Sequence, residues 1–470
     1  MAEDKTEKTL RIGVLSDIHV TDDASTPILR QALELFRAQK VDGVLIAGDL
    51  AERGRVDELV RVGRVWREVF AGMAVEKLFV YGNHDAEGWT YQYLKSEIKS
   101  HPELYADHNL ISKNPAAAWK TAFGEDYPGD IYLKRVKGYA FVGAQYKNEK
   151  NIPGLAQFLS AHADELKGTA PFFYFQHVHP AGTCSAPWTC CQDDGASTRE
   201  LSRFPNAVAI SGHSHTTLTD ERTIRQGDFN FTSVGTASLR YIIPFGGREN
   251  STPFGTPFTG DKQMPDLLNS SPSPARAAHQ GMVMTVEADR IVFARYDIGC
   301  GEKLGPDWVV PLGEAGALTY GARAKKASVP QLPKKAVVSF AETKGKSMRG
   351  VPTDQVVVSF PPARSSDGAR AFDYEVTATR KEGGLTFVVS RKRVYSPAYF
   401  RAESCEPETV TCVFAKRELP WGTPFTFTVR PLNAFGGAGR AVESKKCKLP
   451  DPNAPKKTLK TAPAKKEVKA

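Results

Sequence analysis

Five short polar clusters, each directly after an apolar run, are the feature that most constrains the fold of this 470-residue chain. The clusters are Asp17-Ile18-His19, Gly48-Asp49, Gly82-Asn83-His84-Asp85, His177 and Gly212-His213-Ser214-His215. The apolar runs predict buried strands, so each cluster is expected at a strand end. In open α/β sheets the loops at the carboxyl ends of the strands converge. The pattern therefore predicts that side chains far apart in sequence meet in one polar site.

Strand-like and helix-like segments alternate around these clusters. Residues 10–15 predict a strand, and Thr26 as a cap before Pro27 predicts the start of a helix. Further strands are expected over residues 41–47, 77–81, 140–144, 171–176, 207–211 and 230–234, and further helices over residues 56–70 and 155–166. A short polar turn between residues 281–286 and 291–296 indicates a β-hairpin. Such alternation is typical of a layered α/β domain.

The chain is too long for one typical core, so we expect more than one folded unit. The later pattern consists of strands alone, at residues 356–358, 372–376, 385–389 and 425–429, which predicts a β-sandwich. Residues 244–278 are dense in Pro, Gly and Ser and predict a long irregular loop. The expected division is a flexible N-terminus (1–9), a catalytic domain (10–320), a linker (321–345), a β-sandwich (346–448) and a disordered basic tail (449–470).

The net charge of +9 is concentrated at the C-terminal end of the chain. From Lys445 onward nine lysines stand against Asp451 and Glu467, which leaves only +2 for everything before them. Because the catalytic region lacks a concentrated basic stripe, specific binding of nucleic acid is not expected. The apolar runs are shorter than the ~18 residues of a membrane-spanning helix, so no membrane span is expected.

The start of the chain and its cysteines bear on the expected compartment. The first ten residues lack the apolar middle of a secretory signal. The seven cysteines include no CxxC pair and lie outside the polar clusters, which favours a structural role over a redox one. A hairpin could bring Cys405 and Cys412 together, although spacing alone does not establish a disulfide. We favour an exported bacterial protein, with its leader absent from this sequence, over a cytoplasmic one.

The clusters supply carboxylate, amide and imidazole ligands in number and kind for two adjacent metal ions. Asp49 stands alone after a glycine, and we expect its carboxylate to bridge both ions. The other expected ligands are Asp17, His19 and His215 for one ion, and Asn83, His177 and His213 for the other. This ligand set without thiolates favours Mn, Fe or Zn. Either His177 or His179 could reach a metal, and His177 is favoured because it comes first after the strand.

His84 follows the expected ligand Asn83, and the local turn could direct its imidazole toward a substrate. Imidazole titrates near neutral pH, so His84 is the expected general acid for a leaving oxygen. Asp85 is expected to orient or charge-stabilise that imidazole. This pair is the predicted catalytic machinery.

The order Asp-x-His, Gly-Asp, Gly-Asn-His-Asp, His, Gly-His-x-His resembles the calcineurin-like metallophosphoesterase superfamily over about residues 10 to 300. The resemblance implies a four-layer αββα sandwich, two sheets between helices, with a dinuclear metal centre. Residues 211–215 and 225–229 look like bacterial members. Purple acid phosphatases have a tyrosine ligand near the Gly-Asp motif, which Gly48-Asp49-Leu50-Ala51 lacks, so a purple iron centre is not expected. The segment from Thr428 to Gly436 resembles a fibronectin type III module.

The favoured function is hydrolysis of a small phosphate ester, monoester or diester, by a hydroxide that bridges the two metals. One alternative is a nuclease or nucleotide phosphodiesterase, and another is a metal-binding scaffold without turnover. The loop over residues 181–197 is a candidate pocket wall, and Trp89 or Trp188 could stack on a base or sugar. For both tryptophans packing is favoured over stacking. The sequence leaves the natural substrate, the metal and the oligomeric state open.

Overall fold

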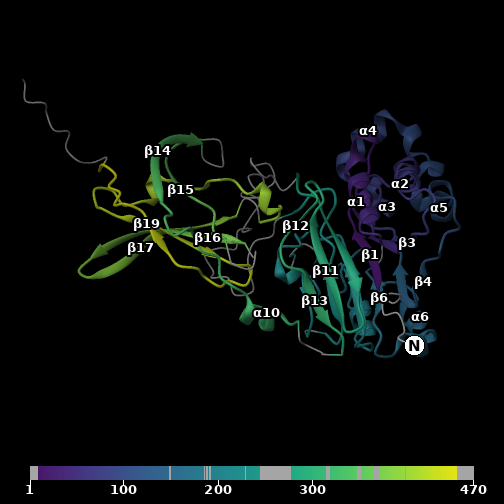
Figure 1. Ribbon diagram of the computed structural model, residues 1–470. Helices are drawn as coiled ribbons and strands as arrows, with labels where there is room; N and C mark the ends of the chain where they lie inside the picture. The colour runs from purple at the N-terminus through teal and green to yellow at the C-terminus, as the bar shows by residue number, and fades with distance from the viewer. Residues whose placement is uncertain are drawn as a thin grey trace, which may run out of the picture.

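The computed structural model describes residues 9–147, 150–184, 186, 189, 192–227, 229–243, 277–313, 318–346, 351–364, 370–396 and 399–451. Most of the expected flexible N-terminus, irregular loop and basic tail lies outside these residues, as do Trp188, Cys190 and Cys191. An α/β region and a β-rich C-terminal region lie side by side (Figure 1). Within the described residues, helices with the length and apolar character needed to cross a bilayer are absent.

The first sheet carries the N-terminal strands. Its seven described strands are β1 (Leu10–Leu15), β2 (Gly43–Ala47), β3 (Glu76–Val80), β10 (Gln280–Val286), β11 (Arg290–Asp297), β12 (Glu302–Lys303) and β13 (Trp308–Pro311). The order is β12-β11-β10-β1-β2-β3, and β13 pairs with β11. β1, β2 and β3 are parallel, and β10 runs antiparallel to β1. Every residue of β2 is buried, as expected of a parallel strand covered on both faces.

The second sheet contributes the other strand ends. Its six described strands are β4 (Ile131–Val136), β5 (Tyr139–Ala144), β6 (Phe172–Phe175), β7 (Ala207–Ser211), β8 (Ile224–Arg225) and β9 (Thr232–Gly235), in the order β4-β5-β6-β7-β9-β8. β5, β6, β7 and β9 are parallel neighbours. Their carboxyl ends therefore lie at one edge, where His177 and His213 follow β6 and β7.

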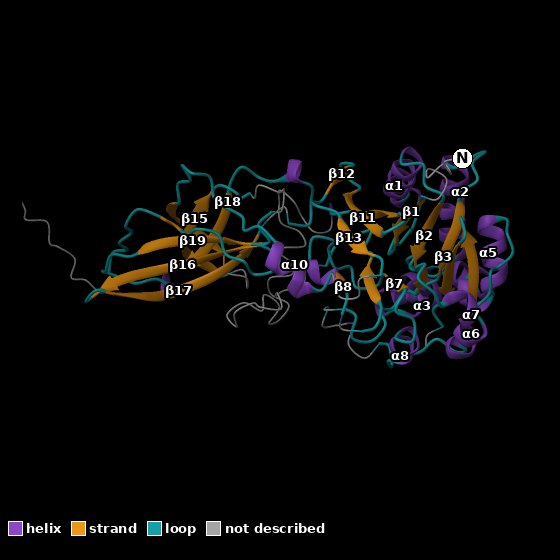
Figure 2. Cartoon of the chain, turned by 60° about the horizontal axis from the view of Figure 1, so that its bottom comes forward, coloured by secondary structure: helices purple, strands orange, loops and turns teal. Residues whose placement is uncertain are grey.

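Helices accompany both sheets (Figure 2). They are α1 (Pro27–Ala38), α2 (Val56–Val69), α3 (Asn83–Glu87), α4 (Lys95–Ser100), α5 (Pro115–Phe123), α6 (Leu155–Ala161), α7 (Ala163–Leu166), α8 (Ala196–Leu201) and α10 (Tyr320–Lys326). The apolar faces of α1, α2 and α5 pack on the first sheet in one hydrophobic cluster. α6, α7 and α8 contribute to a separate cluster with the second sheet. The helix expected over residues 155–166 is divided at His162 into α6 and α7.

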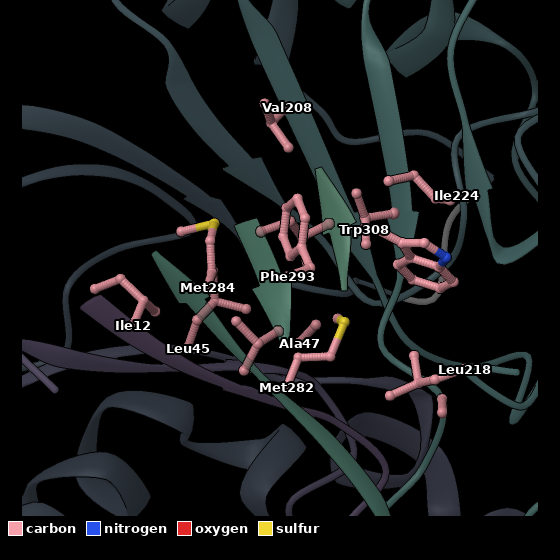
Figure 3. Close-up of a cluster of buried hydrophobic side chains, with 14 of the residues drawn as sticks. Ile12, Leu45, Ala47, Val208, Leu218, Ile224, Met282, Met284, Phe293 and Trp308 are labelled. Carbon is pink, nitrogen blue, oxygen red and sulfur yellow. The ribbon is translucent and has the colours of Figure 1, made fainter. Parts of the chain in front are cut away.

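A third hydrophobic cluster joins the two sheets. Side chains of the first sheet, such as Ile12, Leu45 and Phe293, belong to the same buried cluster as Val208 of the second sheet (Figure 3). Burial of apolar surface at about 25 cal/mol per Å² makes such a cluster the main stabilising contact between layers. The cluster therefore fixes the carboxyl ends of the two sheets relative to each other.

The C-terminal region consists of two antiparallel sheets. One contains β14 (Ser339–Lys346), β15 (Pro352–Phe360) and β18 (Val410–Ala415), and the other contains β16 (Asp373–Glu382), β17 (Leu385–Tyr395), β19 (Thr426–Leu432) and β20 (Val442–Glu443). Alternating residues of both sheets, among them Val356 and Phe427, form one buried cluster. The expected linker over residues 321–345 holds most of α10 and most of β14. The Thr319 side chain accepts from Ala322 N and caps α10, a signal that the Ala- and Lys-rich composition concealed.

The two regions share buried aromatic contacts. Phe372, Tyr395, Tyr399 and Phe400 of the C-terminal region belong to the cluster that also holds Leu218. Gln280 Nε2 donates to Phe400 O at 2.7 Å. Cys405 lies against the first region, with its Sγ 3.8 Å from Cys300 Sγ, whereas Cys412 is buried inside the C-terminal cluster. The Cys405 and Cys412 pair considered from the sequence is therefore not brought together.

Candidate metal centre

The five polar clusters lie at the facing carboxyl edges of the two sheets. Asp17 and His19 follow β1, Asp49 follows β2, and Asn83 begins α3 directly after β3. The predicted ligands are all buried, and Asp17, Asp49 and His177 are at most 1% exposed. Charged and imidazole side chains are rarely buried this completely unless they are paired or bind a metal.

Strained backbone aims these side chains. Asp17, His19, Asp49, His213 and His215 all have left-handed φ values between 50° and 66°. Residues with a Cβ rarely adopt this conformation. Backbone hydrogen bonds between the loops hold it, among them Asp17 N to Gly48 O at 3.0 Å and Ile18 N to Asp49 O at 2.8 Å.

A glycine is required where the β3 loop passes the β2 loop. A Cβ at Gly82 would lie 2.2 Å from Asp49 Oδ1 and 2.5 Å from Asp49 N. Such an approach is open only to a residue without a side chain. Gly82 therefore allows the β3 loop to bring Asn83 and His84 up to Asp49.

The first potential ligand group contains Asp17, His19 and His215, whose ligand atoms all lie within 4.8 Å of one another. His215 Nε2 is 3.1 Å from Asp17 Oδ1 and 3.3 Å from His19 Nε2. Tyr241 O lies 2.9 Å from His215 Nδ1, which leaves Nε2 directed at the group. A backbone carbonyl that takes the other ring nitrogen is the usual support of a metal-binding imidazole.

The second group contains Asp49, His177 and His213, again within 4.8 Å. His177 Nε2 lies 3.2 Å from Asp49 Oδ2 and 2.8 Å from Asn83 Oδ1, while its Nδ1 lies 2.8 Å from Ala47 O. Asn83 Nδ2 donates to Tyr91 OH at 2.6 Å, so the amide oxygen is the atom turned inward.

Asp49 stands between the two groups. The same Oδ2 atom is 3.6 Å from His19 Nε2 of the first group and 3.2 Å from His177 Nε2 of the second. His84 N donates to the other carboxylate oxygen at 2.9 Å. One carboxylate oxygen of Asp49 therefore lies close to an imidazole of each group.

The pKa values reflect this concentration of acids and imidazoles. Burial by itself raises the pKa of Asp17, but His215 and His19 outweigh it and hold this pKa well below its usual range. Burial lowers the pKa of His177, yet the Asp49 carboxylate raises it to about 9. Burial, together with the His177 charge, lowers the pKa of His213 to about 3. Acids held ionised beside buried imidazoles form a cage suited to cations.

His84 is half-buried beside these two groups, and it forms a further candidate ligand group with His19 and Asp49. Its Nδ1 is 2.8 Å from Glu52 O, and its ring lies edge-on to His19 with 4.5 Å between ring centroids. The role of Asp85 beside the His84 imidazole stays a prediction. The Asp85 carboxylate accepts from the N–H groups of Leu50, Ala51 and Gly82, so it ties the β2 and β3 loops together. Three backbone N–H groups thus donate to the carboxylate that was assigned from the sequence to the His84 imidazole.

His179 does not join either group. His177 is the histidine of this stretch that the second group includes, whereas His179 lies near Gly235 and Thr223. Among the described residues, the buried His179 Nε2 has no hydrogen-bond partner.

Two side chains at the site were not predicted from the sequence. Glu52 Oε2 lies 2.7 Å from His19 Nδ1, and Tyr93 OH donates to Glu52 Oε1 at 2.6 Å. Gln192, in the loop considered as a pocket wall, has Oε1 2.6 Å from His213 Nε2. The position of Glu52 three residues after Asp49 was the available hint. Trp89 donates to Ser112 Oγ at 3.3 Å and packs beside Lys113, away from the two groups.

Residues 10–217 match the family model of the calcineurin-like phosphoesterases. This part of the chain is a calcineurin-like phosphoesterase domain. The resemblance expected from the sequence is confirmed over that range. A comparison of the whole chain with curated proteins finds no match.

Solved structures similar to the phosphoesterase domain include three at low identity. A dimetal phosphatase from Danio rerio is 14% identical with a TM-score of 0.41, covering 65% of this chain and 99% of that one. GAP50 from Plasmodium, described as the anchor in the inner membrane complex, is 10% identical with a TM-score of 0.38. The match covers 66% of this chain and 90% of that one. A purple acid phosphatase from yellow lupin (Lupinus luteus) seeds is 11% identical with a TM-score of 0.41, covering 64% and 54%.

Proposed function

We propose that the phosphoesterase domain hydrolyses small phosphate esters with two metal ions, Mn, Fe or Zn. Asp17, His19 and His215 would hold one ion, and Asn83, His177 and His213 the other. The observation that carries this proposal is the position of the Asp49 carboxylate between two compact His/Asp groups. When bound, paired cations supply an activated water and neutralise charge on the phosphoryl oxygens.

The protein's own contribution centres on His84. With Nδ1 donating to Glu52 O, the protonated imidazole has Nε2–H free to protonate the leaving oxygen. Burial lowers the pKa of His84, and the carboxylates of Asp49 and of Glu52, the latter 3.5 Å from His84 Nδ1, oppose that shift. Glu52 thus contacts both His19 and His84 and would position them together.

The architecture expected from the resemblance is also part of the proposal. The hydrophobic clusters between the sheets and beneath their helices support a four-layer αββα sandwich. The two antiparallel sheets of the C-terminal region support a fibronectin type III-like fold over residues 346–448. An experimental structure with another layer order or strand connectivity would contradict this assignment.

The test of the function is Asp49→Asn, an isosteric change that removes the charge facing both groups. We expect the variant to fold, to lose bound metal by elemental analysis, and to lose hydrolysis of chromogenic phosphate monoesters and diesters. Asp289→Asn, in the exposed turn between β10 and β11, is the matched control and should behave as wild type. Hydrolysis that survives undiminished in Asp49→Asn would reject the mechanism.

The same assay separates an enzyme from a scaffold. A wild-type protein that retains two metals per chain, yet hydrolyses neither ester class after loading with Mn, Fe or Zn, is the metal-binding scaffold. The ratio of monoester to diester rates gives the reaction subclass.

A further inference from the structure

A cavity of about 70 Å³ lies at the junction of the α/β region and the C-terminal region. Its lining includes Glu221, Arg295 and Leu304 from the first region and Arg370, Phe372 and Phe435 from the second. A single water needs about 10–15 Å³ of such space, so the cavity has room for a small polyatomic ion. The residues of the candidate metal centre are not part of its lining.

Two arginines line this cavity, and Arg295, on β11, is the buried one. It is 3% exposed, and its guanidinium lies over the Trp308 ring at 4.4 Å. Nη1 donates to Leu218 O at 2.6 Å and to Glu221 Oε1 at 3.1 Å, and Nη2 donates to Pro306 O. Nε is buried and has no hydrogen-bond partner among the described residues.

Arg370, three residues before β16, is the other cation. Its Nη2 donates to Leu304 O at 3.0 Å, which fixes the guanidinium across the junction. Its Nη1 is buried without a hydrogen-bond partner among the described residues. Burial lowers the pKa of Arg370, and the nearby Arg295 charge adds to this effect against the opposing charges of Glu406 and Asp297.

Glu221 does not supply the missing acceptors. It is the acidic residue in the lining, and its carboxylate already accepts from Arg295, from Arg323 and from Trp308 Nε1. The described lining therefore includes two arginines, each with one buried guanidinium N–H that lacks a partner among the described residues, and the apolar side chains of Leu304, Phe372 and Phe435. Buried donors of this kind call for an acceptor, and guanidinium edges match the oxygens of phosphate, sulfate or carboxylate.

We propose that this junction cavity is a binding site for a small oxyanion of phosphate size, held by Arg295 and Arg370. The proposal does not depend on the phosphoesterase activity. Because the two arginines belong to different regions, the bound anion joins them and stabilises their contact. Such a ligand raises the melting temperature by binding the folded state alone.

The test uses the full chain stripped of metal by a chelator and dialysed, so that anions do not bind to metal ions at the other site. Phosphate, sulfate and acetate are titrated separately by calorimetry, and Tm is measured at each concentration. We expect at least one of them to bind at one site per chain and to raise Tm. Arg370→Met keeps the apolar stem but removes the guanidinium, and should weaken that binding at least tenfold. Arg417→Met, an exposed arginine in the same region, should leave it unchanged.

Two results would overturn the proposal. One is the absence of binding by all three anions in wild type, which would leave the cavity to water. The other is equal binding in Arg370→Met and wild type. If Arg370→Met does not fold, crystals of wild type soaked in selenate decide the matter, since the anomalous peak must lie between Arg295 and Arg370. A soaked crystal without that peak counts against the site.

Discussion

The loops around the candidate metal centre and the turns of the C-terminal region both enter left-handed backbone conformations, but with different residues. At the metal centre these positions hold aspartate and histidine, as at Asp17, Asp49 and His213. In the described part of the chain after residue 318 they hold only glycine, as at Gly383 and Gly436. Glycine adopts this conformation without a steric penalty, whereas other residues pay about 1–3 kcal/mol each.

At the metal centre the left-handed positions hold side chains that can bind a metal, whereas in the C-terminal region they hold the residue that adopts this backbone conformation most easily. A glycine at Asp17 or Asp49 would relieve the backbone but remove a ligand. The loops are instead held by hydrogen bonds between them and by the buried cluster between the sheets. Changes at the metal centre should therefore alter activity, and changes in the C-terminal region should alter stability.

The largest expected effect is on catalysis, from His84→Gln. General acid catalysis contributes about 10²- to 10⁴-fold, so kcat for esters with poor leaving groups should fall by that range. Esters of strongly acidic phenols need no proton and should lose far less. Steady-state rates across a series of leaving groups measure this, with elemental analysis to show that metal content is retained. His162→Gln, outside the site, is the control. An equal fall in kcat for every leaving group would show that His84 is not the general acid.

Phe427→Ala tests the other side of the comparison. Phe427 is fully buried in the C-terminal cluster, so its truncation should lower the free energy of unfolding by about 3–5 kcal/mol. Urea denaturation measures the loss, and Phe387→Ala, 42% exposed, should cost far less. The kcat of the folded Phe427→Ala protein should stay within about twofold of wild type. A large fall in kcat would show that the two regions are coupled.

A smaller effect concerns pH and His279, the residue before β10. Burial lowers the pKa of His279 from its ordinary value of 6.5. Below pH 6.5 the unfolded chain therefore binds more protons than the folded one, so acidification destabilises the protein and stability returns as pH rises. In His279→Gln the free energy of unfolding should fall less between pH 7.5 and pH 5 than in wild type. If the free energy of unfolding changes with pH by the same amount in the variant and in wild type, His279 is not the source of the pH dependence.

The smallest expected effect is a gain in stability from Lys40→Gly. Lys40 follows α1 with a φ of 55° and, unlike Asp17 or Asp49, contributes nothing to the metal centre. Glycine should raise the free energy of unfolding by about 0.5–1 kcal/mol, because it relieves a left-handed helix end. Lys40→Ala retains a Cβ and should give no such gain. If alanine and glycine are equally stable, backbone conformation is not what limits this position.

Much of the α/β region was predictable because strands, helices and glycine-containing turns leave local patterns. Residues 10–15 and 207–211 are strands in the structure with those same limits. The convergence of the polar clusters followed from their position at strand ends. By contrast, the strand β4 was not predicted. It is joined to β5 by a two-residue turn, Lys137-Gly138, in which both residues have positive φ. Two successive left-handed residues are typical of a tight hairpin.

The parts that could not be predicted depend on contacts between distant segments. Glu52 and Gln192 become site residues only because folding brings them to His19 and His213. The Asp85 carboxylate could contact either the His84 imidazole or backbone N–H groups. In the structure it accepts from Leu50 N and Ala51 N of the neighbouring β2 loop. The two arginines of the junction cavity lie 75 positions apart in the chain and share no motif.

The aromatic contacts between the two regions have a practical consequence for anyone shortening this chain. A version that ends near residue 330 would lose Phe372, Tyr395, Tyr399 and Phe400, and would leave their apolar partners such as Leu218 open to water. Large uncovered patches of this kind promote association. A truncated phosphoesterase domain would thus need polar replacements on that surface before it could be handled as a monodisperse sample.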